Sequence, residues 1–137
     1  MVYNEAKTSF GKGEIAFTTD TIKVAILDST YTPNIDTHVY FSDVTGEITG
    51  GGYTAGGYTL ASKTATTDTV NNRAEFDAAD VVINSFTNVF RYLVVYKSTG
   101  VAATSRLICY IDLGSNVTVT NSTYTITWNA DGIFQLT

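Results

Sequence analysis

Apolar and polar residues alternate along much of this chain with the period of two that β-strands require. The clearest case is residues 21–27, where Ile22, Val24 and Ile26 share one face and polar Lys23 lies on the other. This alternation predicts a strand with one buried face. β-Branched and aromatic residues are frequent throughout the sequence, and they fit a pleated, half-buried surface better than a helix.

Residues 87–97 form the longest alternating stretch, and both of its faces are apolar except at Arg91. A strand with two apolar faces is typical of a central strand that is covered on both sides. Shorter stretches predict further strands at residues 58–64, 72–76, 81–83, 107–112, 117–120, 123–128 and 132–136, and residues 14–19 are an additional candidate for a short strand. Eight or nine short strands predict a mainly β fold, a single antiparallel β-sandwich (jelly-roll or immunoglobulin-like) or a barrel.

Two glycine-containing segments predict the connections between strands. Residues 129–132 predict a hairpin turn, because Asp131-Gly132 supplies the positive φ values that such turns need. Residues 50–57 hold five glycines around Tyr53 and predict an irregular loop. The last of these glycines is not directly followed by a Lys-Ser or Lys-Thr pair, which excludes a phosphate-binding loop of the usual kind.

Helical spacing occurs near the start of the chain. Val2, Ala6 and Phe10 follow one another at intervals of four, which predicts a short helix over residues 3–10 that caps one end of the sandwich. A single helical turn is expected at residues 36–41, with an aspartate as its N-cap. The whole chain, residues 1–137, is predicted to be one domain in which residues 1–12 form the helix or an arm.

The core is predicted from the apolar positions that fall in phase on these strands. Ten residues are expected to be buried: Ile22, Val24, Ile26, Phe76, Leu93, Val95, Leu107, Cys109, Ile126 and Trp128. The terminal segments, residues 1–10 and 132–137, are the candidates for arms that reach a neighbouring copy.

The charge of the chain excludes some classes of binding partner. The 137 residues include 8 basic and 13 acidic ones, for a net charge of −5, and no basic cluster of the kind that binds nucleic acid. Charged residues make up 15% of the chain, against about 25% in an average soluble domain. Thr, Ser and Asn must therefore supply much of the polar surface, which suits lasting contacts between proteins.

Several kinds of site and segment are not expected. One Cys and one His exclude an intrachain disulfide, a cysteine cluster and a multi-histidine metal site. No apolar run reaches the roughly 18 residues of a membrane helix, and the first residues lack the apolar core of a signal peptide. We therefore expect a soluble protein without membrane contact or cofactor.

Acidic residues are the remaining candidates for ion binding or acid–base chemistry. Asp36, Asp43 and Glu47 lie close together in the sequence, but their spacing lacks the regular pattern of a calcium loop. Asp77 and Asp80 are more typical of turns and caps. Nothing in the spacing pairs two carboxylates as a glycosidase would.

The remaining single residues favour structural roles. Cys109 is in phase with apolar neighbours, which predicts a small buried side chain rather than a reactive thiol. His38 follows a run of turn residues and is expected to be structural or to face solvent. Asn116 and Asn121 match the glycosylation pattern, as chance alone predicts in a Thr-rich chain.

Four tyrosines lie in the loops around the first strands and the glycine cluster: Tyr31, Tyr40, Tyr53 and Tyr58. Tyrosines beside Thr and Gly can form a rigid contact surface at low entropic cost. We take them as the candidate protein-contact surface. The alternatives are stacking on sugars and simple covering of the core.

Segments spread along nearly the whole chain also resemble those of one family. The matching segments are residues 21–38, 40–44, 52–57 with 60–61, 72–78, 96–100, 103–105, 110–114 and 126–130 with 132–133. In this order they resemble a family of small structural proteins of tailed-bacteriophage virions. The resemblance implies a virion protein that is not an enzyme, and it carries no catalytic residues to transfer.

Together with the small size, the low charge and the absence of a catalytic motif, the resemblance favours a capsid decoration, or cement, protein that binds and stabilises the assembled shell. Its expected partners are the major capsid protein or another virion protein and further copies of itself. It would be made in the bacterial host cytoplasm and located in the virion. One alternative is a neck, collar, tail or tail-fibre component, since such proteins resemble one another. Another, suggested by the tyrosines, is a glycan-binding adhesion module.

Overall fold

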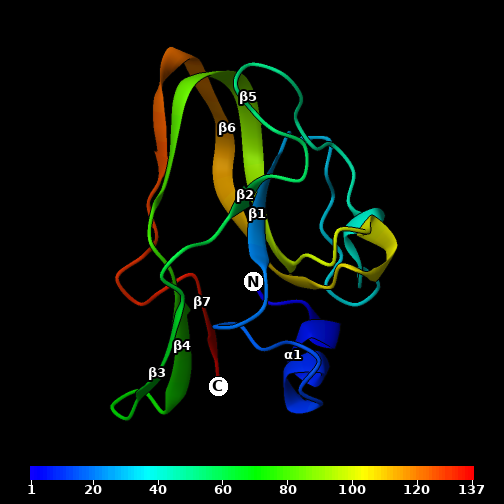
Figure 1. Ribbon diagram of the computed structural model, residues 1–137, viewed down its shortest axis with the longest axis vertical. Helices are drawn as coiled ribbons and strands as arrows, with labels where there is room; N and C mark the ends of the chain where they lie inside the picture. Colours follow the sequence, from blue (N-terminus) through cyan, green and yellow to red (C-terminus); the bar gives the residue numbers. More distant parts are fainter.

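The computed structural model describes all 137 residues, and it is mainly β, as predicted (Figure 1). The elements in chain order are α1 (Asn4–Gly11), β1 (Ile22–Leu27), the 3₁₀ helix η1 (Phe41–Asp43), β2 (Tyr58–Thr59), β3 (Thr64–Asp68), β4 (Arg73–Asp77), β5 (Val81–Lys97), the 3₁₀ helix η2 (Ala102–Thr104), β6 (Leu107–Ile126) and β7 (Phe134–Leu136).

The strands form two antiparallel sheets. The larger has the order β2-β1-β5-β6 and the smaller the order β3-β4-β7. The predicted central strand is confirmed, because β5 lies between β1 and β6 and every residue from Tyr92 to Tyr96 is buried. β1 is more buried than predicted. Ile22, Val24 and Ile26 are buried as expected. Ala25 and Leu27 on the opposite face are fully buried too, so both faces of β1 are covered.

Seven strands replace the eight or nine that were expected, because several predicted strands are continuous. Residues 81–83 and 87–97 belong to β5, and the three segments predicted between residues 107 and 128 belong to β6. The predicted interruptions are bulges. The β5–β6 register shifts around Phe86, and Ser85 and Asn121 have φ values of 53° and 43°. These irregularities let the ribbon arch over at the top of Figure 1 rather than end there.

Two other strand predictions are wrong. Residues 14–19 form turns instead of a strand, since the amides of Thr19 and Asp20 both donate to the carbonyl of Ala16. The strand predicted over residues 58–64 stops at Thr59. Ser62 adopts a φ of 51°, a left-handed conformation that a regular strand does not contain.

The helical turn expected at residues 36–41 is displaced to η1. Asn34, rather than Asp36, caps the preceding turn, because its Oδ1 accepts the amides of Asp36 and Thr37. Asp43 belongs to η1 itself and receives two backbone amides through its Oδ2.

The turn at residues 129–132 forms but does not make a hairpin. The amide of Gly132 donates to the carbonyl of Asn129 at 2.8 Å, and Gly132 has a φ of 86°. β6 before the turn belongs to the larger sheet, whereas β7 after it pairs with β4 in the smaller one. The chain therefore crosses between sheets here.

All ten predicted core residues are buried, and they belong to one cluster of 29 buried residues. The helix is confirmed as α1, with Ala6 buried and Val2 and Phe10 half-buried. No helix combines the length and apolar character needed to cross a membrane.

Four phenylalanines join α1 and the loop after it to the smaller sheet. The rings of Phe76 and Phe134 stack at 4.6 Å between centroids, Phe10 lies 5.3 Å from Phe76, and Phe17 meets Phe134 edge-on at 5.5 Å. Aromatic contacts of this geometry add to the apolar burial. They fix β7 opposite α1 at the lower end of Figure 1.

Candidate functional site

Two of the four candidate tyrosines are core residues. Tyr31 is 2% exposed, and its hydroxyl lies 2.6 Å from that of Tyr3 and 3.0 Å from Nδ1 of His38. Tyr53 is 8% exposed, donates to Glu47 at 2.7 Å and accepts the amide of Ile26. Burial and the bond to Glu47 raise the pKa of Tyr53 far above its usual value. Neither ring is presented to a partner, which corrects this part of the prediction.

The other two tyrosines are half-buried. The guanidinium of Arg106 lies 5.4 Å from the ring centre of Tyr40. Tyr58 donates to the carbonyl of Gly52 at 3.2 Å, and burial raises its pKa. The predicted contact surface is therefore reduced to the exposed parts of Tyr40 and Tyr58.

Four of the five candidate carboxylates, those of Asp36, Asp43, Glu47 and Asp80, accept hydrogen bonds within the fold, whereas the buried Oδ1 of Asp77 has no hydrogen-bond partner. Glu47 accepts the amide of Gly56 at 2.6 Å in addition to the Tyr53 hydroxyl, and Asp36 accepts the side-chain amide of Asn4 at 2.6 Å. Asp80 accepts the amide of Trp128 at 3.0 Å, as expected of a turn residue. The structure contains no group of three or more His, Cys, Asp or Glu side chains that could hold a metal ion.

Cys109 is fully buried, which confirms its predicted packing role. Burial raises the pKa of its thiol to about 12, so the thiolate that would react is not formed at neutral pH. His38 is half-buried beside Tyr31, with ring centres 5.7 Å apart, and holds a structural position.

The glycine-rich loop is tied to β5. The amide of Thr87 donates to the carbonyl of Gly51 at 2.8 Å, and the side-chain amide of Asn88 donates to Gly50 at 3.0 Å. A Cβ at Gly51 would lie 1.9 Å from the carbonyl oxygen of Thr87. Glycine is needed here for close approach of two backbones.

A part of the surface without charged residues lies on the arching ribbon. None of the 21 charged residues falls within residues 81–90 of β5 or residues 113–130 of β6 and its following turn. We call these two segments the neutral arch. Arg91 and Asp112 form a two-point ion pair at its base, with nitrogen–oxygen distances of 2.9 and 3.0 Å.

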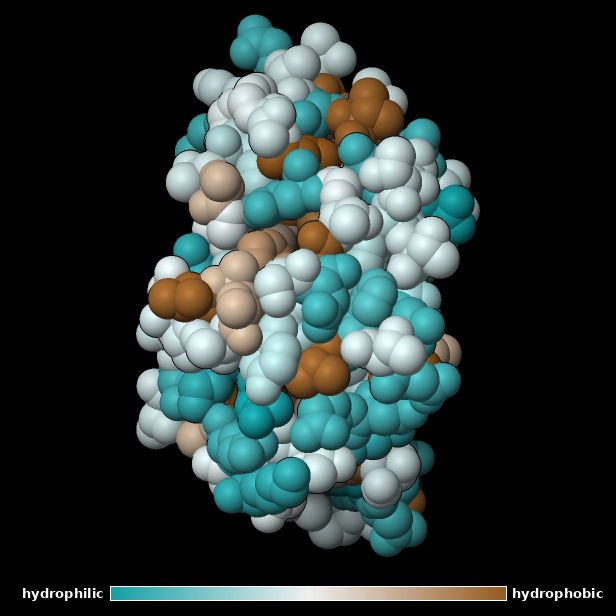
Figure 2. Space-filling view, turned by 90° about the vertical axis from the view of Figure 1, so that its right-hand side faces the viewer, coloured by the Kyte–Doolittle hydropathy of each residue, from teal (hydrophilic) through white to brown (hydrophobic).

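The exposed side chains of the neutral arch are hydroxyls, amides and two valines. Val82 is 57% exposed opposite Thr125, and Val89 is 48% exposed opposite Thr118. Beyond Tyr110, no segment of the chain pairs with the outer edge of β6. The arch therefore offers neutral side chains together with unpaired backbone groups. Figure 2 shows a face of the molecule on which hydrophobic side chains form only small separate patches.

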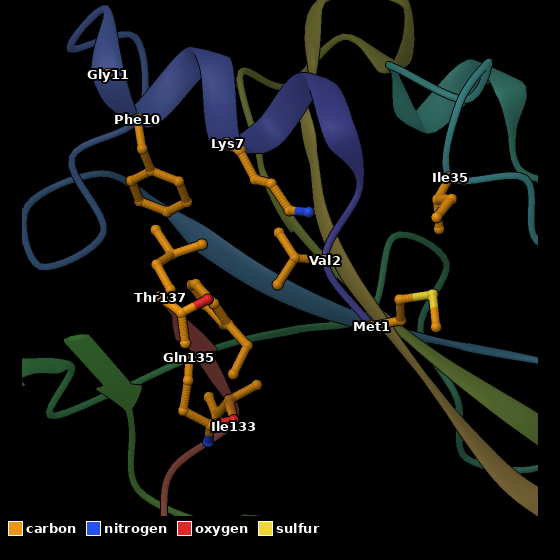
Figure 3. Close-up of a pocket in the computed structure, with 11 residues that line it drawn as sticks. Met1, Val2, Lys7, Phe10, Gly11, Ile35, Ile133, Gln135 and Thr137 are labelled. Atoms are coloured by element: carbon orange, nitrogen blue, oxygen red, sulfur yellow. The ribbon is translucent and has the colours of Figure 1, made fainter. Parts of the chain in front are cut away.

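A second surface feature is a groove of about 740 Å³ between α1 and β7, at the opposite end of the molecule from the top of the arch, where β5 and β6 bend over (Figures 1 and 3). Most of its lining is apolar, with Val2, Phe10, Ile35, Ile133 and Leu136 among the contributing side chains. We call it the end groove. In Figure 3, Phe10 extends from α1 toward β7, Lys7 extends from α1 toward Val2, and Ile35 lies on the far side.

The two terminal segments predicted as arms are folded onto their own domain. The amide of Tyr3 donates to the carbonyl of Ile108 at 3.0 Å, and that of Tyr110 donates to Met1 at 2.9 Å. The C-terminal segment pairs with β4 through β7.

Neither contact surface was identified from the sequence. The neutral arch has a sequence signal, two long runs without a charged residue, but only the fold brings them side by side. The end groove has none, because it depends on how α1 docks against a strand more than a hundred residues away.

Comparison with models of known protein families, with curated proteins and with solved structures found no match. The function is therefore inferred from the neutral arch and the end groove.

Proposed function

We propose that this chain is a structural protein of a tailed-bacteriophage virion, without enzymatic activity, and that it decorates the capsid. In this role it binds the assembled shell as a small homo-oligomer and stabilises the contacts between capsid subunits. The observation that carries the proposal is the neutral arch. The sequence resemblance to small virion proteins supports it independently.

A neutral surface suits permanent contact with another protein. Burying a charge costs several kcal/mol unless the partner supplies a matching one, and the arch contains no charge to bury. Its Thr, Ser and Asn side chains and the free edge of β6 can all form hydrogen bonds with a partner.

Stabilisation of the shell follows from linkage. A protein that binds the assembled lattice and not the free subunits shifts the equilibrium toward the lattice. Several such contacts in one oligomer raise the apparent affinity without requiring a large area at each contact.

The finer description of the fold belongs to this proposal. We propose that the two sheets are the layers of one β-sandwich domain, of the jelly-roll or immunoglobulin-like kind, with its helix at one end. The shared core of 29 residues, which includes residues of both sheets, supports this description.

The alternative position in the neck or tail would use the same neutral surface. The glycan-binding alternative is weakened, because Tyr31 and Tyr53, two of the four tyrosines that suggested it, are buried.

The proposal is tested by adding purified protein to shells that lack it. We expect the wild-type chain to bind and to raise the temperature at which the shells open. Thr118→Lys places a charge on the exposed arch, and we expect it to weaken shell binding by about tenfold or more.

Thr66→Lys is the matched control, because Thr66 is also exposed on a strand but lies on β3, outside the arch. We expect it to bind like the wild type. The decoration role is wrong if wild-type protein leaves the opening temperature of the shells unchanged. The arch is the wrong surface if both lysine variants bind equally well.

A further inference from the structure

The end groove has one wall that is an unpaired strand edge. β7 is the last strand of the smaller sheet and pairs only with β4, through the partners Phe134–Phe76, Gln135–Glu75 and Leu136–Ala74. No backbone hydrogen bond links the other edge of β7 to α1 or to the N-terminal segment. An unpaired edge of this kind is a template for one more strand.

The second wall is the apolar side of α1 together with Val2, two residues before the helix. Phe10 and Val2 are half-buried and line the groove, and Ile35 closes it on the far side (Figure 3). A volume of about 740 Å³ is within the range of about 300–1,000 Å³ that is typical of ligand pockets. The combination of a free strand edge and apolar walls fits an extended backbone with apolar side chains.

Lys7 supplies the charge of the groove. Its ammonium forms no salt bridge within the chain, and its one hydrogen bond, to the side chain of Asn4 three residues earlier at 3.4 Å, is long. The residue is exposed and lines the groove. A carboxylate on the incoming segment would complement it.

We propose that the end groove binds an extended segment of a different protein chain, which adds to the free edge of β7. This segment has apolar side chains at alternate positions and an acidic residue that meets Lys7. Main-chain hydrogen bonds to β7 provide affinity, and the apolar walls select the side chains.

A second copy of this chain is a poorer occupant. Its natural strand donors are its terminal segments, and both are already paired. Val2 bridges to Cys109 on β6, and Phe134–Leu136 pairs with β4. An exchange between copies would have to break these hydrogen bonds, whereas an unpaired segment of another protein loses none.

The inference rests on the proposed function only for the identity of the partner. If the chain decorates a capsid, the segment comes from a virion protein, and the groove and the neutral arch contact the shell at opposite ends of the molecule. Binding of an extended acidic, apolar segment is expected in either case.

The test uses a display library of random linear peptides, panned against the full-length protein. We expect enrichment of peptides that alternate apolar residues and contain Asp or Glu. An enriched peptide, made synthetically, should slow hydrogen exchange of the Phe134–Leu136 amides. Its affinity should fall about tenfold in Lys7→Glu, because attraction becomes repulsion.

Lys12→Glu is the matched control. Lys12 is also exposed, caps the same helix and does not line the groove, so binding should be unchanged. Gly11→Leu provides a second test of the groove. A Cβ at Gly11 meets no atom within 4 Å, so the variant should fold and partly fill the groove.

Three results would overturn the proposal. The first is that the library enriches no peptide whose binding is weakened by Lys7→Glu or Gly11→Leu. The second is that peptides bind without slowing the hydrogen exchange of the β7 amides. The third is that the protein alone forms a dimer that dissociates when the groove is mutated. If peptides bind the groove but the protein does not bind shells, the proposed function fails while the groove assignment stands.

Discussion

At the scale of single residues, positive φ values and close backbone contacts fix where the loops meet the sheets. Gly57 is the clearest case. It has a φ of 73°, and a Cβ there would lie 1.9 Å from the carbonyl oxygen of Val24. Gly57 immediately precedes β2, which pairs with β1 at this point. A side chain at residue 57 would therefore separate the two strands.

We predict that Gly57→Ala lowers the free energy of unfolding by about 3 kcal/mol, since the variant combines a steric clash with a left-handed backbone. Gly100→Ala is the control. Gly100 has a φ of 86° but no atom within 4 Å of its would-be Cβ, so only the backbone cost of about 1 kcal/mol applies. Urea unfolding measures both. Equal losses would show that the close approach to Val24 does not matter.

Residue types predicted burial better than exposure. The ten core residues are correct because apolar alternation determines which face of a strand turns inward. Tyr31 and Tyr53 were misplaced because a tyrosine suits a core or a contact surface equally well. Its hydroxyl needs a partner in a core, and the partners here, Tyr3 and Glu47, come from separate segments of the chain.

At the scale of elements, the caps decide where the short helices form. Oδ2 of Asp43 accepts the amides of Val39 and Tyr40 at 2.8 Å each. These backbone hydrogen bonds hold the pKa of Asp43 below its usual range, and the bond from Tyr40 has the largest effect. Because the folded-state pKa is the lower one, the contribution of this carboxylate to stability is complete above the unfolded value of about 4. The contribution is lost as the pH falls through the folded-state value.

We predict that Asp43→Asn lowers the free energy of unfolding at pH 7 by about 1 kcal/mol, as the loss of a cap typically does. The difference from the wild type should shrink below pH 4, where protonation removes the same charge from Asp43. Urea unfolding between pH 2 and pH 7 provides the test. A difference that stays constant over this range would contradict the assigned role of the carboxylate.

The long strands show what local sequence can and cannot reveal about an element. Residues that interrupt the alternation, around Ser85, Gly114 and Asn121, were interpreted as strand ends, and the structure places left-handed backbone at all three. The irregularities were therefore located correctly but their consequence was not. Pairing with the neighbouring strand continues across a bulge, and that pairing is a tertiary property.

At the scale of the whole molecule, charged and uncharged surfaces are separated. Ion pairs join the loop after α1 to the lower ends of the long strands, where Lys97 meets Asp20 at 2.9 Å and Arg106 meets Glu14 at 3.1 Å. The neutral arch lies at the other end (Figure 1). The top of the arch and the end groove are therefore two distinct surfaces at opposite ends of the molecule. The proposed bridging of neighbouring capsid subunits would require two such surfaces.

The central claim is that this chain is an abundant component of a virion shell, and its copy number tests that claim most directly. Quantitative mass spectrometry of purified particles would give the ratio of this chain to the major capsid protein. We predict a ratio near one or a simple fraction such as one third. A few copies per particle would assign the chain to the neck or tail instead, and its absence from particles would contradict the virion proposal altogether.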